Sequence, residues 1–172
     1  MAEAPMPVGK SFSIRRRILA LALVLLLAAA VAFMGATVTE IGPWYAGLAK
    51  PRWAPPDAAY GAAWTVIYAL TALAGVRGWL AARTKAEREW LLGLFALNGF
   101  LNIAWSLIFF QLRRPDWAMV EVLALWVSVA VLILVIWRRS MTGALLLVPY
   151  LAWVTFAGYL NMTIVRLNGP FG

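Results

Sequence analysis

The sequence contains no cysteine and no histidine. Without cysteine, disulfides, thiol catalysis and iron–sulfur ligation are excluded, and without either residue the usual zinc sites are excluded as well. The absence of histidine also removes the most common general base and a frequent haem ligand. Most enzyme chemistries are therefore disfavoured, and we predict no metal site.

Charged residues are also scarce. They make up 13% of the 172 residues, whereas 64% are hydrophobic and the mean hydropathy is +0.82. In soluble domains only about half of the residues are apolar, so this composition indicates an integral membrane protein. The net charge of +8 is carried by short clusters of cations between apolar runs, which favours contact with phospholipid headgroups over nucleic acid.

Five apolar runs are long enough to cross a bilayer, which takes about 20 helical residues. Because backbone groups cannot stay unpaired in lipid and the alternation of a membrane barrel is missing, each run is expected to be a helix. Short connections after the second, third and fourth runs make consecutive helices antiparallel neighbours. We predict an all-α integral membrane protein with one five-helix domain over residues 18–168, its helices at about 18–38, 59–82, 90–112, 117–137 and 142–165.

A basic segment, residues 1–17, precedes the first predicted helix. Its cations, followed by an apolar run, resemble a secretory or twin-arginine signal. The apolar run is long for a signal and lacks a clear cleavage site, so we expect a retained helix behind a cytoplasmic extension. Ten of the 15 Lys and Arg residues then lie on the N-terminal side of the membrane and five on the other. This bias predicts a cytoplasmic N-terminus if the membrane is an inner one. We also expect the protein to be bacterial.

Aromatic and amide residues recur at helical spacing on one face of the second, third and fifth predicted helices, and the fourth carries a tryptophan. Counted from one membrane boundary, most of them lie about 8 to 18 Å deep, which is too deep for an interfacial aromatic belt. We therefore predict one cavity with flat apolar walls and two carboxamides, suited to a planar aromatic ligand. The residues are Trp64, Tyr68, Asn98, Asn102, Trp105, Trp126, Tyr150, Trp153 and Ala157.

An alternative interpretation is open for these residues. The aromatic side chains would fill space between helices, and the asparagines would form interhelical hydrogen bonds, which is a common use of polar residues in membranes.

The loop of residues 40–58 is rich in aromatics, prolines and cations. We predict that it covers the cavity as a lid, stiffened by its prolines. Lys50 and Arg52 are candidates for pairing with ligand carboxylates, although loop cations often stay solvated or face headgroups.

Three runs of the sequence resemble a known protein family. The runs WYAGLAKPRWAPP (44–56), LNGFLNIAWSLIFF (97–110) and VPYLAWVTFAGYLN (148–161) resemble, in order and spacing, the tryptophan-rich sensory protein and translocator protein family, TspO/MBR. The resemblance covers about residues 40–168. It implies a five-helix membrane bundle, often a homodimer, that binds porphyrins, haem and synthetic aromatic ligands beneath the loop between helices one and two.

The resemblance also implies roles for single residues. It assigns the nine cavity residues above to the ligand pocket, with the lid residues Trp53, Pro55 and Pro56 closing it. Some family members promote light- and oxygen-dependent breakdown of porphyrins, and their two key tryptophans match Trp64 and Trp153. A tetrapyrrole such as protoporphyrin IX or haem would be a ligand, and no cofactor is required.

Departures from the family concern the width of the pocket and sterol binding. Gly61 stands where the family often has proline, and Gly158 where threonine is frequent. The cholesterol pattern fails at the C-terminus, because six residues separate Tyr159 from Arg166. Three functions remain open: a tetrapyrrole-binding sensor that regulates or transports its ligand in a stress response, a photochemical porphyrin degrader, and a passive transporter or scaffold.

Two further features carry predictions. Glu121, the one acid within an apolar run, lies a turn below Trp117 and is expected to reach water or pair with Arg113 or Arg114. No acid lies at mid-membrane, which disfavours a drug/proton antiporter. For a homodimer, small residues that allow close helix approach form two ridges, Ala28, Ala32 and Ala36 in the first helix and Gly93, Ala96 and Gly99 in the third.

Overall fold

The computed structural model describes residues 42–171, together with Ile18 and Ala22. The basic extension, almost all of the predicted first helix and its alanine ridge lie outside the described residues. Within them the chain forms helices and no strands: α2 (Pro43–Gly47), α3 (Asp57–Ala81), α4 (Lys85–Ser106), η1 (Leu107–Gln111), α5 (Pro115–Trp137), α6 (Met141–Leu145) and α7 (Val148–Asn168).

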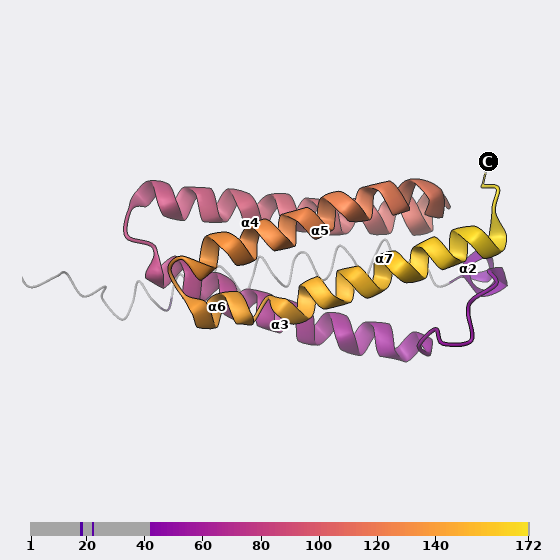
Figure 1. The fold of residues 1–172 in the computed structure, drawn as a ribbon, viewed down its shortest axis with the longest axis horizontal. Helices are drawn as coiled ribbons and strands as arrows, with labels where there is room; N and C mark the ends of the chain where they lie inside the picture. Colours follow the sequence, from indigo (N-terminus) through magenta and orange to yellow (C-terminus); the bar gives the residue numbers. More distant parts are fainter. Residues whose placement is uncertain (1–17, 19–21, 23–41, 172) are drawn as a thin grey trace, which may run out of the picture.

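The long helices run side by side and alternate in direction (Figure 1). Four segments of the described chain are long and apolar enough to span a membrane, α6 and α7 counting together as one. The protein is therefore an all-α, multi-pass membrane bundle. We call the end that carries α2 and the C-terminus the lid end, and the opposite end, where α3 passes into α4 and α5 into α6, the basic end.

Helix α5 forms the centre of the bundle because it packs against both α4 and α7. Its residues Leu125, Val129, Leu132 and Ile136, spaced three or four apart, are buried in the main hydrophobic core. Its other face stays apolar and exposed, as Leu134 at 66% exposure illustrates. Such a helix, apolar all round, fits a bundle whose outer face meets lipid instead of water.

The third span ends in a π-helix, which the regular spacing of its sequence did not predict. In η1 the N–H of Leu112 donates to the carbonyl of Leu107 over 2.9 Å, a bond that spans five residues. This wider turn adds a residue, so the adjacent Phe109 and Phe110 both face the ligand cavity described below. The span ends at Gln111, and Arg113, whose φ is 54°, lies in the short connection that leads into α5.

The fifth predicted helix, 142–165, is divided into α6 and α7. The break falls at Leu146 and Leu147, just before Pro149, which occupies the first turn of α7 and donates no backbone hydrogen bond. Gly143 lets α6 pack closely, since an added Cβ would lie 2.9 Å from Ile136 Cγ2 and 3.0 Å from Arg77 Cβ. The remaining predicted helices agree with the structure within a few residues at most ends, α4 beginning five residues early, at Lys85.

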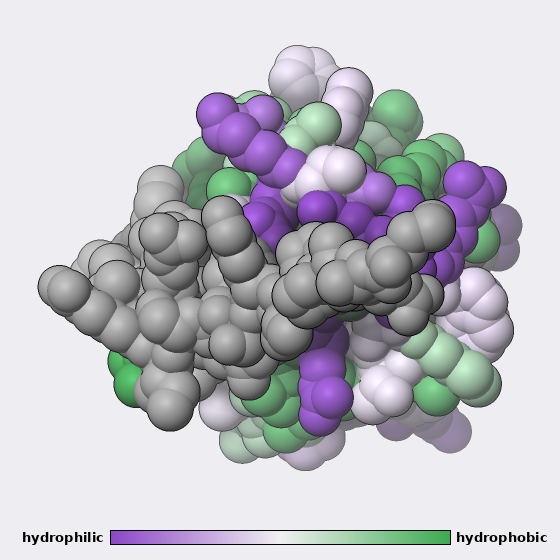
Figure 2. Space-filling model, turned by 90° about the vertical axis from the view of Figure 1, so that its left-hand side faces the viewer, coloured by the Kyte–Doolittle hydropathy of each residue, from purple (hydrophilic) through white to green (hydrophobic). Residues whose placement is uncertain are grey.

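The basic end gathers hydrophilic side chains (Figure 2). Arg77, Arg83, Lys85, Arg138 and Arg139 are all exposed there. Cations at helix ends suit contact with water and lipid phosphates, so this end is a membrane boundary.

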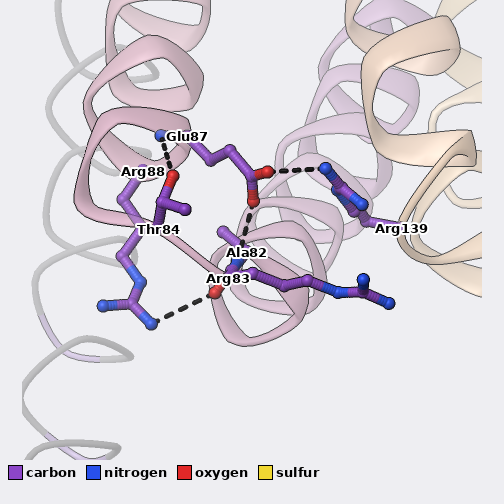
Figure 3. Close-up of polar contacts among 6 residues, drawn as sticks. All are labelled: Ala82, Arg83, Thr84, Glu87, Arg88 and Arg139. Carbon is purple, nitrogen blue, oxygen red and sulfur yellow. Dashed lines mark hydrogen bonds and ion pairs between the residues drawn. The ribbon is translucent and has the colours of Figure 1, made fainter.

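Glu87 ties the two connections of the basic end together (Figure 3). Its N–H donates to the Thr84 hydroxyl at 3.1 Å, and its carboxylate accepts from the Arg83 N–H at 2.7 Å, which caps α4. The same carboxylate pairs with Arg139, beyond the end of α5. One acid therefore joins the α3–α4 turn to the α5–α6 turn.

We expect Glu87→Gln to lower the melting temperature of the detergent-solubilised protein. The change removes the ion pair to Arg139 and weakens the cap of α4. Glu89→Gln is the matched control. Among the described residues Glu89 pairs only with Lys85, across one helical turn, where both side chains are exposed. Equal melting temperatures for the two variants would show that the contacts of Glu87 contribute nothing.

Candidate functional site

A cavity of about 620 Å³ lies near the lid end, with walls from α3, α4, η1 and α7 and with α2 at its mouth. This volume is in the range that holds drug-sized ligands. Its walls are largely aromatic and aliphatic. The lining residues are Tyr45, Asp57, Ala58, Tyr60, Gly61, Trp64, Thr65, Tyr68, Asn102, Trp105, Ser106, Phe109, Phe110, Trp153, Ala157, Leu160, Asn161 and Ile164.

Six of the nine residues that sequence spacing assigned to one cavity do line it, namely Trp64, Tyr68, Asn102, Trp105, Trp153 and Ala157. Their rings form ordered contacts. Trp64 stacks on Tyr68 with centroids 5.3 Å apart and meets Trp153 edge to face at 6.4 Å. On the facing helix Trp105 stacks on Phe109 at 5.1 Å. The cavity is thus bounded by flat π-faces from three helices.

The two predicted carboxamides also join helices. The Tyr68 hydroxyl donates to Asn102 Oδ1 at 2.9 Å, and Asn102 Nδ2 donates to the Tyr150 hydroxyl at 3.3 Å, which links α3, α4 and α7. Asn98 Nδ2 donates to Ser128 Oγ at 2.8 Å, which links α4 to α5. Asn98 and Tyr150 are buried behind the cavity wall and do not line it. The predicted interhelical bonds and the predicted cavity are therefore both present.

Trp126 lies away from the cavity. It borders a separate groove of about 340 Å³ between α5 and α7, where its indole N–H donates to Thr155 Oγ1 at 2.8 Å. At 39% exposure its side chain faces outward. Sequence spacing gave the depth of Trp126 but not the side of α5 on which it lies. Gly158, expected to affect pocket width, lies in this outer groove, whereas Gly61 does line the cavity and has open space beside it.

The lid residues cover the end of α7. Trp53 stacks on Tyr159 with centroids 5.3 Å apart and meets Phe156 edge to face at 5.9 Å. Pro55 and Pro56 precede α3, and Pro56 is its N-cap. None of these three lines the cavity, although Trp153, which does, contacts Phe156 beneath the lid.

A second set of contacts fastens the lid. The N–H of Ala49 donates to Asn168 Oδ1 at 2.7 Å, and Asn168 Nδ2 donates back to the Ala49 carbonyl at 2.9 Å. Asn168 is the last residue of α7. The lid is therefore hydrogen-bonded to the C-terminal end of the bundle.

Charged and phenolic groups meet at the cavity mouth. Lys50 Nζ lies 3.8 Å from Asp57 Oδ1 and 3.7 Å from the centroid of the Tyr45 ring. Burial, followed by the nearby Tyr60 and Asp57, raises the pKa of the Tyr45 hydroxyl well above its usual range. Tyr45 therefore stays neutral, and Lys50 is engaged with Asp57. Arg52, the other predicted carboxylate partner, is exposed.

Several lining residues were not assigned to the site from the sequence. The spacing does place Phe109 and Asn161 on the helical stripes of Trp105 and Trp153, although it does not single them out as pocket residues. Tyr45 and Tyr60 come from the lid and the first turn of α3. Tyr60 lies one turn before Trp64 and so continues the stripe of α3, whereas no periodicity identifies Tyr45, because its place depends on how the loop folds back.

Two structural predictions need correction. Glu121 does not pair with Arg113 or Arg114, because Arg114 pairs with Asp116 at the start of α5. Both carboxylate oxygens of Glu121 are buried and have no hydrogen-bond partner in the described part of the chain. In the third-helix ridge Gly93 and Ala96 face outward, whereas Gly99 is buried in the bundle, so these three residues do not form one exposed surface.

Comparison with known proteins finds one matching family and several relatives. A model of the TspO/MBR family matches residues 15–167. The chain is 42% identical over 159 residues to the tryptophan-rich protein TspO of Chlorobaculum tepidum, covering 89% of this chain and 98% of that protein. It is 36% identical to the human translocator protein over 73% of this chain and 75% of the human one. It is 34% identical to the tryptophan-rich sensory protein of Cereibacter sphaeroides, over 73% and 77% of the two chains.

Proposed function

The chain belongs to the TspO/MBR family, and we propose that it is a membrane-embedded binding and sensory protein for porphyrins and haem-like tetrapyrroles. It would also take aromatic drug-like ligands. The observation that carries the proposal is the cavity of about 620 Å³ with Trp64, Trp105 and Trp153 in its walls. Stacked and edge-to-face contacts with such indoles stabilise the binding of planar apolar ring systems.

The chemistry of the walls fits a tetrapyrrole that is bound and not chemically ligated. The sequence has no histidine or cysteine, two of the usual ligands of haem iron, and we propose that haem is held mainly through contacts with its ring faces. The propionates of a porphyrin would lie at the mouth, where Lys50 and Arg52 are the nearby cations of the lid. Lys50 would then exchange Asp57 for a ligand carboxylate.

The names of two relatives support a sensory or transport role. The relative from Cereibacter sphaeroides is a tryptophan-rich sensory protein, and the human relative is a translocator protein. For this chain we propose that binding regulates or transports tetrapyrroles in a stress response. A passive transporter or scaffold in such a response is the alternative.

The proposal is tested by titrating the protein in nanodiscs with protoporphyrin IX in the dark. We expect saturable quenching of tryptophan fluorescence, because three indoles border the cavity and would lie beside the ring. Unchanged fluorescence over the full titration would reject tetrapyrrole binding.

A second candidate function is light- and oxygen-dependent breakdown of the porphyrin. The edge-to-face contact of Trp64 with Trp153 at 6.4 Å in the cavity wall favours it, since a photoexcited porphyrin beside electron-rich indoles can react without an acid–base residue. Under illumination, this candidate requires loss of the porphyrin spectrum in the wild type. Trp64→Phe and Trp153→Phe would stop the loss while binding in the dark persists. Quenching of tryptophan fluorescence without loss of the porphyrin spectrum would reject breakdown and favour the binding and sensory function.

Membrane orientation and assembly are proposals as well. We propose a cytoplasmic basic end, from the distribution of Lys and Arg, and a homodimer. Light scattering corrected for detergent would measure the assembly, and Ala96→Leu would place a bulky side chain on the outward face of α4. If Ala96→Leu has the same oligomeric state as the wild type, this face of α4 is not the dimer interface.

A further inference from the structure

Asn161 is an unusual member of the cavity wall. It lies in α7, lines the cavity and is 1% exposed. Neither its carboxamide nitrogen nor its carboxamide oxygen has a hydrogen-bond partner among the described residues. Buried polar groups in proteins are nearly always paired, because an unpaired one loses its hydration without compensation. Asn161 therefore has both a donor and an acceptor to offer to a bound group.

The other buried asparagines of the bundle differ in this respect. Asn98 bonds to Ser128, and Asn102 bonds to Tyr68 and Tyr150, so their amides hold helices together. Asn161 makes no such link, and its helix neighbours Leu160 and Ile164 pack in an apolar cluster with Phe109. A leucine would suit these surroundings better than an amide, so helix packing does not explain the asparagine.

A second unpaired donor occurs in the same wall. The indole Nε1–H of Trp105 is buried and has no acceptor in the described part of the protein. Trp105 packs against the cluster that contains Leu160, which directly precedes Asn161, and Ile164, which lies nearly one helical turn after it. The wall thus contains two unpaired donor groups and one unpaired acceptor.

The charge of the wall limits what that ligand group can be. Of the described residues that line the cavity only Asp57 is charged, and it is acidic. A carboxylate deep in the cavity would therefore lose its hydration without gaining a cation. A carboxamide side chain presents a donor and an acceptor side by side, which matches a group that is uncharged and also donates and accepts at adjacent atoms.

From these contacts we propose that Asn161 anchors the ligand by binding an uncharged amide or lactam group, with the indole N–H of Trp105 as a second donor. The amide N–H would donate to Asn161 Oδ1, and the amide carbonyl would accept from Asn161 Nδ2. This inference rests on the proposed function, since it assigns a contact inside the same cavity.

The test compares two uncharged derivatives of one ring, protoporphyrin IX dicarboxamide and protoporphyrin IX dimethyl ester. Their side chains carry no charge to hold them beside Lys50 and Arg52 at the mouth, so they can turn toward Asn161 in the wall. The amide both donates and accepts, whereas the ester only accepts. For the wild type in nanodiscs, tryptophan quenching should give an affinity about 5-fold higher for the amide, the effect of one added hydrogen bond. Asn161→Leu should abolish this preference, mainly by lowering the affinity for the dicarboxamide.

Thr163→Val is the matched control in α7, because Thr163 bonds only to the Tyr159 carbonyl and lies outside the cavity. It should keep the preference of the wild type. Equal affinities of the wild type for the two derivatives would overturn the role of Asn161 and leave the proposed function standing, whether or not the leucine variant folds. A preference that survives in Asn161→Leu would overturn it too. Binding of protoporphyrin IX itself but of neither derivative would overturn the role of Asn161 as well, whereas failure of all three to bind the wild type would reject porphyrin binding itself.

Discussion

Ala157→Phe is expected to lower the affinity for protoporphyrin IX by about 10- to 100-fold, the cost of forcing a ring into filled space. Ala157 lies in the cavity wall, one turn of α7 beyond Trp153. A methyl group there leaves room for a planar ligand, whereas a phenyl ring would occupy the space between α3 and α7. Titration in nanodiscs, followed by tryptophan quenching in the dark, measures the affinity.

Ala152→Phe is the control for this prediction. Ala152 is in the same helix, is exposed and does not line the cavity, so a ring at this position points toward lipid. It should bind porphyrin as the wild type does. Both variants should melt near the wild-type temperature, because the added ring enters space that the free protein leaves empty. Undiminished binding by Ala157→Phe would mean that porphyrin does not occupy this cavity.

Much of the fold could be predicted from the sequence because the membrane imposes strong rules. Runs of about 20 apolar residues must be helices, and the predicted spans of α3, α5 and most of α4 agree with the structure. The structure differs from the predicted spans at two places where the backbone leaves the regular α-helical conformation. The π-turn of η1 and the break between α6 and α7 leave the hydrophobic pattern unchanged, so no pattern of apolar residues identifies them.

The candidate site was predictable to the extent that it depends on helix faces. Trp64, Trp105 and Trp153 lie on stripes, and stripes place residues on one side of a helix. Trp126 shows the limit of this argument, since depth alone does not say which neighbour a helix face meets. The pairing of Lys50 with Asp57 across the cavity mouth was equally beyond reach, because it depends on the folded path of the lid.

The hydrogen bonds of Asn102 predict the largest effect on stability. We expect Asn102→Leu to lower the free energy of unfolding by about 2–4 kcal/mol. Tyr150 is 2% exposed and would lose the amide that donates to its hydroxyl, and Tyr68 would lose its acceptor. Equilibrium unfolding in mixed micelles measures the loss. A leucine variant as stable as the wild type would show that the network does not hold α3, α4 and α7 together.

A second substitution distinguishes the contribution of the Asn102–Tyr150 hydrogen bond to stability from that of side-chain packing. Tyr150→Phe removes the buried hydroxyl that loses its Asn102 donor in Asn102→Leu, and eliminating both partners of a buried bond costs less than eliminating one. The double variant Asn102→Leu/Tyr150→Phe should therefore be more stable than the sum of the two single losses predicts, by about 1 kcal/mol. Additive losses would assign the role of Asn102 to its shape. A positive coupling energy would show that the hydrogen bond between Asn102 and Tyr150 contributes to stability. The same amide that forms part of the cavity wall would then also hold α4 and α7 in place.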